Sequence, residues 1–375
     1  MTDERTSSRQ AGVAVHQFVP NLADGDAIGT HVRLTQRVLR GAGFRSDIFY
    51  DEAQSVMKRL GRHYTTYDRE KDGDNGAAIA LFQLSTGSRM TEWLLEQDVP
   101  YGVYFHNVTP PAFFERWEPN AADNLRQAEA QVKRLASRCR FAFAQSTFSK
   151  QALLDVGYAP AEVVPLLIDD EQPARKPNAK VLARLERDTT AGTRWLSVSR
   201  VAPNKCQHDI IAAFAVYRAL HDKSARLTLV GGRTANMYYR SLEVLIEELG
   251  LDDAVDLTDS VPDDERDAHF RVADVYVSMS EHEGFAAPLI EAMRFHIPTV
   301  AFASSAIPET VGDATLLLDD KDPVVVAEAV HRIASDASLR ASLIEAGDRR
   351  AERYSVANVG RQLVDAIRRY VPAHV

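Results

Sequence analysis

The sequence predicts an α/β protein made of two doubly wound, Rossmann-like domains. The chain has 375 residues, which exceeds the length at which one hydrophobic core usually stops growing. From Gly12 onward, short runs rich in Val, Ile and Phe alternate with longer segments of helical spacing. This alternation is typical of stacked βαβ units on a parallel sheet.

The first domain is predicted over residues 1–175. Its expected strands are Val13–Val19, Ser46–Tyr50, Ala78–Leu84, Gly102–His106, Phe141–Gln145 and Val163–Ile168. The helical patterns between them are Ile28–Arg40, Arg89–Gln97, Ala121–Ser137 and Lys150–Val156. Prolines and mixed charges then interrupt the alternation, so we expect a linker over residues 176–193, with a short helix at Lys180–Glu186.

The second domain is predicted over residues 194–355, where the alternation resumes. Its expected strands are Trp195–Ser199, Leu227–Val230, Val255–Leu257, Val275–Met279, Thr299–Phe302 and Thr315–Leu318. Residues 356–375 should form a C-terminal helix over Val356–Tyr370, whose apolar stripe is predicted to pack back toward the first domain. Open α/β sheets bind ligands at their carboxyl ends, so we expect a deep cleft between the domains to hold the site.

Composition excludes several classes of protein. A formal charge of -9 argues against bulk binding to nucleic acid. The two cysteines, Cys139 and Cys206, are too few for a disulfide framework or a zinc site, so we expect a reducing cytoplasm and no metal. The polar N-terminus and the absence of a long apolar run predict neither a signal peptide nor a membrane anchor.

The most informative segment is 278–293, which follows a predicted strand and enters a helix. Pro288 suits a first helical turn, and the backbone N–H groups of Leu289 and Ile290 are expected to point out of that helix end toward a phosphate. Glu291 is expected in the same turn, beside the phosphate, where its carboxylate would accept hydrogen bonds from sugar hydroxyls.

Glu283 lies in the loop before this helix, and Gly284 would let the backbone come close to a ligand. By itself the pair Glu283 and Glu291 reads as a solvated loop residue and a carboxylate that favours the helix dipole. Arg200 and Lys205 change this interpretation, because they follow a strand at the same sheet edge and could stabilise a leaving diphosphate.

At these residues the chain resembles the GT-B glycosyltransferases of the large retaining family 4. The stretch Ser199–Lys205 looks like the family's phosphate-binding Arg and Lys, and Glu283 through Glu291 matches its Glu-x7-Glu motif. The resemblance implies that Glu283 contacts the donor sugar and Glu291 the ribose. It also implies that Arg200 and Lys205 bind the diphosphate, and that Phe285 and Leu289 belong to the donor-binding segment.

Further positions follow from the same resemblance. Gly232 ends a strand and would leave room for the nucleotide, while Val261 is similar to a residue whose backbone meets the base. Gly29 matches the glycine loop over the donor phosphates, although the usual adjacent glycine pair is missing. His106 resembles the family's active-site histidine, but Asn107 stands where an aspartate is commoner. For His106 a purely structural role is about equally open.

The implied reaction moves a hexose from a UDP- or GDP-sugar to a hydroxyl acceptor with retention of configuration. The acceptor would be a glycan, a lipid-linked glycan or a small metabolite. No nucleophile is identifiable, and neither a cofactor nor a metal is required, since cations neutralise the phosphate. Two alternatives stay open: a GT-B sugar-nucleotide epimerase, and a catalytically silent subunit that binds nucleotide sugars.

The acceptor is expected against first-domain loops at Tyr64–Asp74 and Thr109–Asn120. The second loop carries aromatic side chains that could stack on sugars but are more often core or lid residues, namely Phe113, Phe114 and Trp117. The basic helix Ala121–Arg140 could approach anionic lipid, although a solvated face is favoured. The sequence does not determine the oligomeric state.

Overall fold

The computed structural model describes residues 13–72, 78–97, 99–188 and 192–371. The polar N-terminus, the end of the predicted acceptor loop at Asp74 and the centre of the predicted linker at residues 189–191 lie outside these ranges.

The first sheet contains seven parallel strands in the order β3-β2-β1-β4-β5-β6-β7. They are β1 (Ala14–Leu22), β2 (Ile48–Ala53), β3 (Arg62–His63), β4 (Ala78–Leu84), β5 (Tyr101–Phe105), β6 (Ala142–Ala144) and β7 (Ala161–Val163). The helices of this part are α1 (Ala27–Gly41), α2 (Arg69–Asp72), α3 (Arg89–Glu96), α4 (Pro119–Ala136) and α5 (Thr147–Asp155). The central strands are buried on both faces and mostly apolar because helices cover both sides, as in other doubly wound sheets.

The second sheet contains six parallel strands in the order β10-β9-β8-β11-β12-β13. They are β8 (Arg194–Val198), β9 (Arg226–Val230), β10 (Val255–Leu257), β11 (Val275–Ser278), β12 (Thr299–Phe302) and β13 (Thr315–Leu318). The helices around it are α6 (Ala179–Arg187), α7 (Gln207–Leu220), α8 (Asn236–Glu248), α9 (Asp263–Val272), α10 (Ala287–Arg294), α11 (Ile307–Val311), α12 (Pro323–Ser335) and α13 (Ala337–Arg353).

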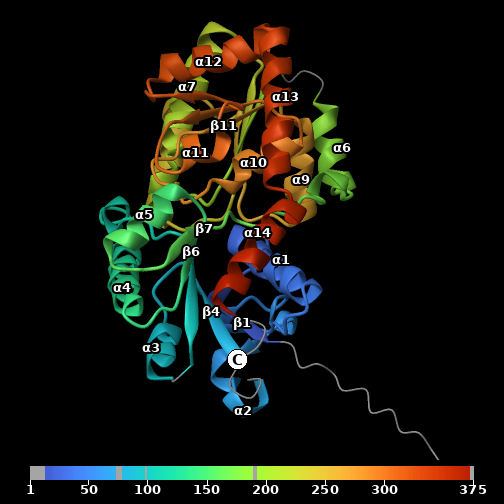
Figure 1. Cartoon of the computed structure of the whole chain (residues 1–375). Helices are drawn as coiled ribbons and strands as arrows, with labels where there is room; N and C mark the ends of the chain where they lie inside the picture. The colour runs from blue at the N-terminus through green and yellow to red at the C-terminus, as the bar shows by residue number, and fades with distance from the viewer. Residues whose placement is uncertain (1–12, 73–77, 98, 189–191, 372–375) are drawn as a thin grey trace, which may run out of the picture.

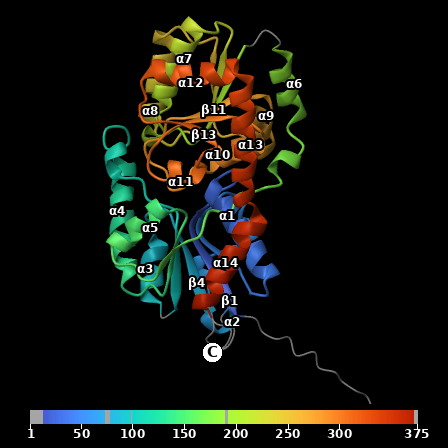
Figure 2. The same ribbon diagram turned by 45° about the horizontal axis from the view of Figure 1, so that its top comes forward.

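The C-terminal helix α14 (Val356–Tyr370) leaves the second sheet and lies against α1 of the first (Figures 1 and 2). A Cβ atom on Gly360 would come within 3.1 Å of the Val38 side chain, so this glycine permits close helix packing. Farther along, the ring of Tyr370 stacks on Phe141 with centroids 4.9 Å apart. The helix thus joins the two halves of the molecule.

The carboxyl ends of the two sheets face each other across a junction formed by loops. Hydrogen bonds across it include those from Arg266 to the Gly25 carbonyl, from Asn107 to His282, from Ser146 to the Gly284 carbonyl, and from Thr147 to Glu309. Glu309 accepts from both the backbone N–H and the hydroxyl of Thr147, at the N-terminus of α5. The described conformation therefore has the two domains in contact.

Most predicted elements agree with the structure, and four strands and the C-terminal helix have the predicted bounds. The strand predicted at Val163–Ile168 is wrong, because β7 spans Ala161–Val163. Val164 still donates to the Ala144 carbonyl, but Pro165 has no N–H with which to continue the ladder. The apolar residues that follow are buried in the core as an irregular segment.

Within the described residues, no helix is both long enough and apolar enough to cross a bilayer.

Candidate functional site

Glu283 and Lys205 form an ion pair at the carboxyl edge of the second sheet. Lys205 lies in the turn after β8 and Glu283 in the loop after β11, and these two strands are neighbours in the sheet. The Lys205 Nζ atom lies 2.6 Å from Glu283 Oε1, and each side chain is 14% exposed. Ser305 Oγ accepts a hydrogen bond from the Glu283 backbone N–H, which fixes the loop. Lys205, which was expected to bind the diphosphate, is thus paired with Glu283, which was expected to bind the sugar.

Arg200 differs from Lys205 in being exposed. Its carbonyl accepts a hydrogen bond from the Gln207 amide, whereas its guanidinium has no hydrogen bond or ion pair with any of the described residues. Arg200 can therefore approach an incoming anion without breaking an existing contact.

Glu291 is not in the first turn of α10, which corrects the sequence prediction. The helix starts at Ala287, after Ala286 in the left-handed conformation with φ of 67°, and no acidic residue lies in its first turn. Pro288 fits either of the first two helical positions, so the sequence did not determine the register. The Leu289 N–H, expected to be free, donates to the Ala286 carbonyl.

The carboxylate of Glu291 lies instead in a charged cluster. Burial raises the pKa of Glu291, and the guanidinium groups of Arg266 and Arg294 oppose that rise. Arg266 also donates to the Gly25 carbonyl of the first domain, and Arg294 to the carbonyl of Asp169. Glu291 is therefore held near the domain junction by neighbouring cations.

Phe285 and Leu289 contribute their side chains to the core. Phe285 is 3% exposed, and its ring meets that of Tyr354 edge to face at a centroid distance of 5.0 Å. Leu289 is 1% exposed. A ligand could therefore contact only the backbone of these two residues in this conformation.

Gly232 and Val261 come from neighbouring strand ends and lie close together. A Cβ atom on Gly232 would fall 2.3 Å from the hydroxyl oxygen of Ser260, the residue before Val261. The strained backbone belongs to the preceding Gly231, whose φ is 153° and whose added Cβ would meet the Ser199 carbonyl at 1.9 Å. The glycines thus permit packing of strand ends here.

Gly29 and Gly284 are also explained by packing. A Cβ atom on Gly29 would lie 2.0 Å from the carbonyl oxygen of Ala23, in the loop that leads into α1. On Gly284 it would lie 2.7 Å from the Asn107 Cβ atom and 2.4 Å from Gln145 Nε2, both in the first domain. Gly284 therefore allows close approach of the first domain.

His106 is buried at the end of β5, where its Nε2 atom lies 2.7 Å from the Gln83 side-chain oxygen. Its Nδ1 atom is buried without a hydrogen-bond partner among the described residues. Burial lowers the pKa of His106 to about 3. The imidazole is consequently neutral at physiological pH and can accept a hydrogen bond, but it does not serve there as a cationic acid.

This buried histidine predicts an acid-sensitive fold. Between the lowered pKa of about 3 and the ordinary value of 6.5, the unfolded chain binds one proton that folded His106 does not bind. The free energy of unfolding should therefore decrease as the pH is lowered below 6.5, and this group contributes up to about 1.4 kcal/mol per pH unit. The unfolding free energy can be measured by urea unfolding at several pH values between about 6 and 4.5. It should change less steeply with pH in His106→Asn than in the wild type, and an equal dependence on pH would contradict this assignment.

His282 is a junction residue that sequence reasoning missed. The Asn107 side-chain amide donates to His282 Nε2 at 2.9 Å, and Asn107 itself has a φ of 68°. Burial lowers the pKa of His282, which favours the neutral acceptor form. The only sequence signal was the place of His282 beside Glu283, together with the unusual Asn107.

The aromatic residues expected near the acceptor pack against the second domain. Phe114 is buried, and Trp117 meets the ring of Tyr238 at a centroid distance of 5.2 Å. The Phe113 ring lies 6.2 Å from that of His282. These contacts favour a packing role over a free stacking surface.

The basic helix α4 is largely neutralised by its neighbours. Arg126 pairs with Glu115 and Asp123, and Arg134 pairs with Glu92. This arrangement favours the solvated face over a lipid contact.

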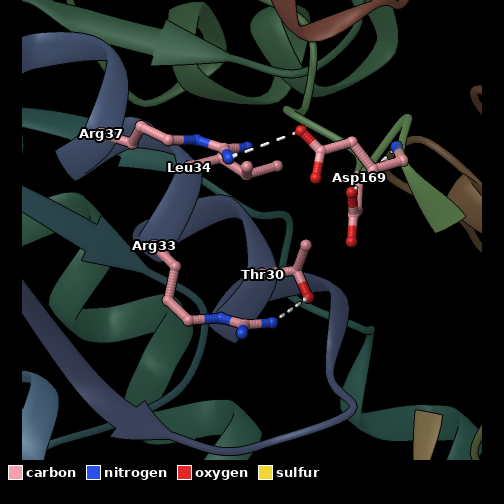
Figure 3. Close-up of a pocket in the computed structure, with 6 residues that line it drawn as sticks. Thr30, Arg33, Leu34, Arg37 and Asp169 are labelled. Atoms are coloured by element: carbon pink, nitrogen blue, oxygen red, sulfur yellow. Dashed lines mark hydrogen bonds and ion pairs between the residues drawn. The ribbon is translucent and has the colours of Figure 1, made fainter. Parts of the chain in front are cut away.

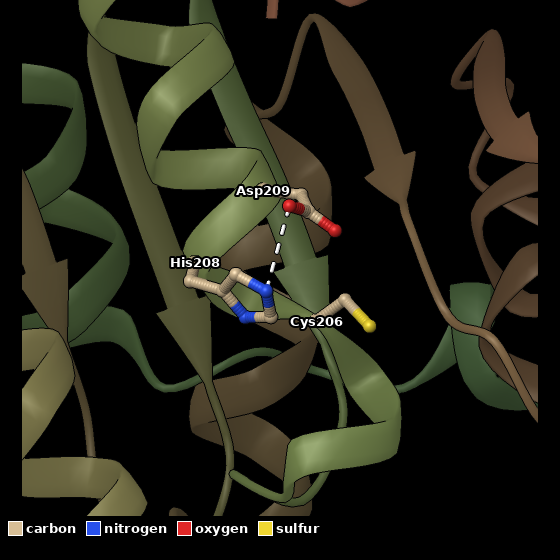
Figure 4. A group of neighbouring side chains, drawn as sticks. All are labelled: Cys206, His208 and Asp209. Carbon is tan, nitrogen blue, oxygen red and sulfur yellow. Dashed lines mark ion pairs between the residues drawn. The ribbon is translucent and has the colours of Figure 1, made fainter. Parts of the chain in front are cut away.

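One group of side chains has metal-ligand character, namely Cys206, His208 and Asp209 (Figure 4). However, Lys321 Nζ lies 2.7 Å from Asp209 Oδ2 and 3.6 Å from the Cys206 sulfur. Burial raises the pKa of Cys206 to about 12, which keeps the thiol protonated. An ammonium group thus takes the position of a cation, and these residues do not fit a metal ion.

A pocket of about 240 Å³ lies between α1 and the segment that leads to the second domain (Figure 3). Its lining residues are Thr30, Arg33, Leu34, Arg37, Asp169 and Glu171. Arg33 bonds to the Thr30 hydroxyl, and Arg37 lies 3.9 Å from Glu171. Cations and carboxylates are mixed here, so the pocket does not select a ligand charge.

Comparison with known proteins places a family match on the second domain. The family model "Glycosyl transferases group 1" matches residues 190–350, less than half of the chain. The D-inositol 3-phosphate glycosyltransferase of Corynebacterium urealyticum is 31% identical over 46% of this chain and 42% of its own length. The GDP-mannose-dependent alpha-(1-6)-phosphatidylinositol monomannoside mannosyltransferase of Mycolicibacterium smegmatis is 30% identical over 56% of this chain and 54% of its own. The chain thus spans about half the length of these relatives.

Solved structures match nearly the whole chain. Sucrose-phosphate synthase from Thermosynechococcus elongatus has a TM-score of 0.74 at 18% identity, covering 95% of this chain and 98% of that one. Anabaena HepE in complex with UDP and glucose has a TM-score of 0.73 at 16% identity, covering 94% and 99%. These similarities confirm the predicted α/β fold of two Rossmann-like domains in the GT-B arrangement.

Proposed function

We propose that this chain is a retaining glycosyltransferase that moves a hexose from a nucleotide diphosphate sugar to a hydroxyl acceptor. The observation that carries the proposal is the ion pair between Lys205 and Glu283, together with the exposed Arg200 in the same loop after β8 as Lys205. These residues lie within the segment that matches the group 1 family model. The structure of HepE with UDP and glucose supports a nucleotide-sugar donor for a protein of this fold.

In this proposal the donor diphosphate opens the ion pair. Its charge exceeds that of one carboxylate, so Lys205 turns toward the phosphate and Arg200 joins it from the exposed side. Glu283 is then free to accept hydrogen bonds from hydroxyls of the sugar. Both cations counter the charge that grows on the leaving phosphate as the glycosidic bond breaks. The acceptor oxygen bonds to the anomeric carbon on the face that the phosphate leaves, and the acceptor's proton passes to the leaving phosphate. The step therefore needs neither a metal nor a protein nucleophile.

Contact between the two domains is the second element of the proposed mechanism. The contacts of Gly284 and Asn107 hold the Glu283 loop against the first domain, which supplies His106. A closed junction would exclude water and limit hydrolysis of the donor. The acceptor then enters from the first-domain side.

Donor and acceptor can be tested together. UDP-glucose and GDP-mannose would each be incubated with D-inositol 3-phosphate or phosphatidylinositol monomannoside. These probes are suggested by the names of the relatives and by the structure of HepE with UDP-glucose. We expect nucleoside diphosphate release that depends on one acceptor, with a product whose anomeric proton keeps the donor configuration. Conversion of donor alone would instead indicate an epimerase. Tight donor binding without release in a broad acceptor panel would indicate a silent subunit.

A further inference from the structure

Two buried glutamines connect His106 to the interior of the first sheet. Gln17 on β1 and Gln83 on β4 are both fully buried. The Gln17 amide nitrogen donates to the Val32 carbonyl at 2.9 Å, and the Gln83 amide nitrogen donates to the Gln17 side-chain oxygen at 2.9 Å. The Gln83 oxygen then lies 2.7 Å from His106 Nε2.

The orientation of this chain of hydrogen bonds is set by one backbone group. The Val32 carbonyl can only accept, so the NH2 end of the Gln17 amide must face it. The oxygen of Gln17 therefore faces Gln83, whose own oxygen must face His106. An oxygen acceptor requires a proton on Nε2, which leaves a lone pair on Nδ1.

The neighbours of His106 do not supply a proton to that lone pair. His31 lies against the His106 ring at a centroid distance of 5.2 Å, and its own Nδ1 accepts from the Leu167 backbone N–H. Its remaining nitrogen, Nε2, faces the Thr35 hydroxyl. Tyr104, the other ring in contact, donates its hydroxyl to the Val164 carbonyl. Among the described residues, His106 Nδ1 is thus a buried acceptor without a donor, which is costly unless a ligand satisfies it.

We propose that Gln17 and Gln83 are positioning residues that hold His106 as the Nε2-protonated tautomer and thereby offer Nδ1 as an acceptor for a hydroxyl of the transferred sugar. The tautomer is a property of the protein alone, and only its use toward the sugar rests on the proposed function. Gln17 acts on His106 indirectly, through Gln83. Without the oxygen of Gln17, the Gln83 amide loses the contact that orients it.

The first test measures the tautomer in the free protein. Nitrogen-15 NMR of histidine-labelled protein, with His106→Asn to assign the signal, should show a protonated Nε2 and an unprotonated Nδ1 at His106 near pH 7. Gln83→Met and Gln17→Met should each shift both nitrogens toward a mixture of tautomers. A wild-type His106 protonated on Nδ1 would overturn the proposal, as would unchanged shifts in both variants.

The second test links the tautomer to the donor. Adding UDP-glucose or GDP-mannose should move the Nδ1 signal of His106 in the wild type, and kcat/KM for the donor should fall about tenfold in each variant, as expected for one misdirected neutral hydrogen bond. Gln131→Met is the matched control, because Gln131 is equally buried but bonds to the backbone of Ser88. If kcat/KM fell as much in Gln131→Met, the loss in the Gln17 and Gln83 variants would be explained by general destabilisation, and the positioning role would be refuted. If His106 has the expected tautomer but neither donor shifts its Nδ1 signal, the contact with the sugar is refuted and the positioning by the glutamines stands.

Discussion

Lys205→Met is expected to lower kcat by about two to three orders of magnitude, which is the usual loss when one preorganised group opposite developing charge is removed. The fold should survive, because Met keeps the apolar stem of the side chain. The change also leaves Glu283, which is 14% exposed, without its cation. The measurement is kcat at saturating donor and acceptor, accompanied by a thermal melt.

The matched control is Lys321→Met. Lys321 is another ion-paired lysine, 18% exposed, that contacts Asp209 and Glu281 and not Glu283. We expect this variant to lose stability while kcat stays within about threefold of the wild type, as for a pair with a structural role only. If both lysine variants lost activity equally, or if Lys205→Met kept near-normal turnover, the proposed role of the Lys205–Glu283 pair would be wrong.

Gly284→Ala should be the second most damaging change, with a loss of about 10- to 100-fold in kcat/KM. The new Cβ atom would lie 2.7 Å from the Asn107 Cβ atom, so the loop or the first domain must move away. A displacement on the order of 1 Å is enough to misplace reacting groups to this extent. Unfolding free energy should fall by only about 1–3 kcal/mol, because the strain can be relieved by opening the junction.

Gly41→Ala serves as the control for Gly284→Ala, since a Cβ atom there would meet nothing within 4 Å. Small-angle X-ray scattering of both variants would report domain separation. A normal kcat/KM in Gly284→Ala, or an unchanged scattering profile with lost activity, would contradict a closure role for this glycine.

Alternation of apolar runs was sufficient to predict the fold. Strands such as β12 and β13 are short, mostly apolar runs of buried and half-buried residues bounded by turns, and this local pattern fixes their ends. Residues 164–168 are equally apolar, yet the ladder ends at Pro165, and residues 166–168 fill the core without joining the sheet. Apolarity therefore predicted burial there but not hydrogen bonding.

The site was predictable only in part, because its geometry depends on contacts between distant residues. Glu283 and Lys205 were expected at the same sheet edge, but their mutual pairing depends on how two loops 78 residues apart lie in space. The start of α10 depends on the left-handed Ala286 and on the Gly284 carbonyl, which is held by Ser146 of the other domain. The second-turn position of Glu291 had no local sequence signal, and the contact of His282 with Asn107 was indicated only by the place of His282 beside Glu283 and by the unusual Asn107.

The central claim is that a nucleoside diphosphate opens the Lys205–Glu283 pair. It is tested most directly by a crystal structure of the wild-type protein with UDP or GDP, whichever gives the larger thermal shift. We predict Lys205 Nζ within hydrogen-bond distance of a phosphate oxygen, Arg200 on the same diphosphate, and Glu283 released from its present 2.6 Å contact. A nucleotide bound elsewhere, with the Lys205–Glu283 pair intact, would contradict this account.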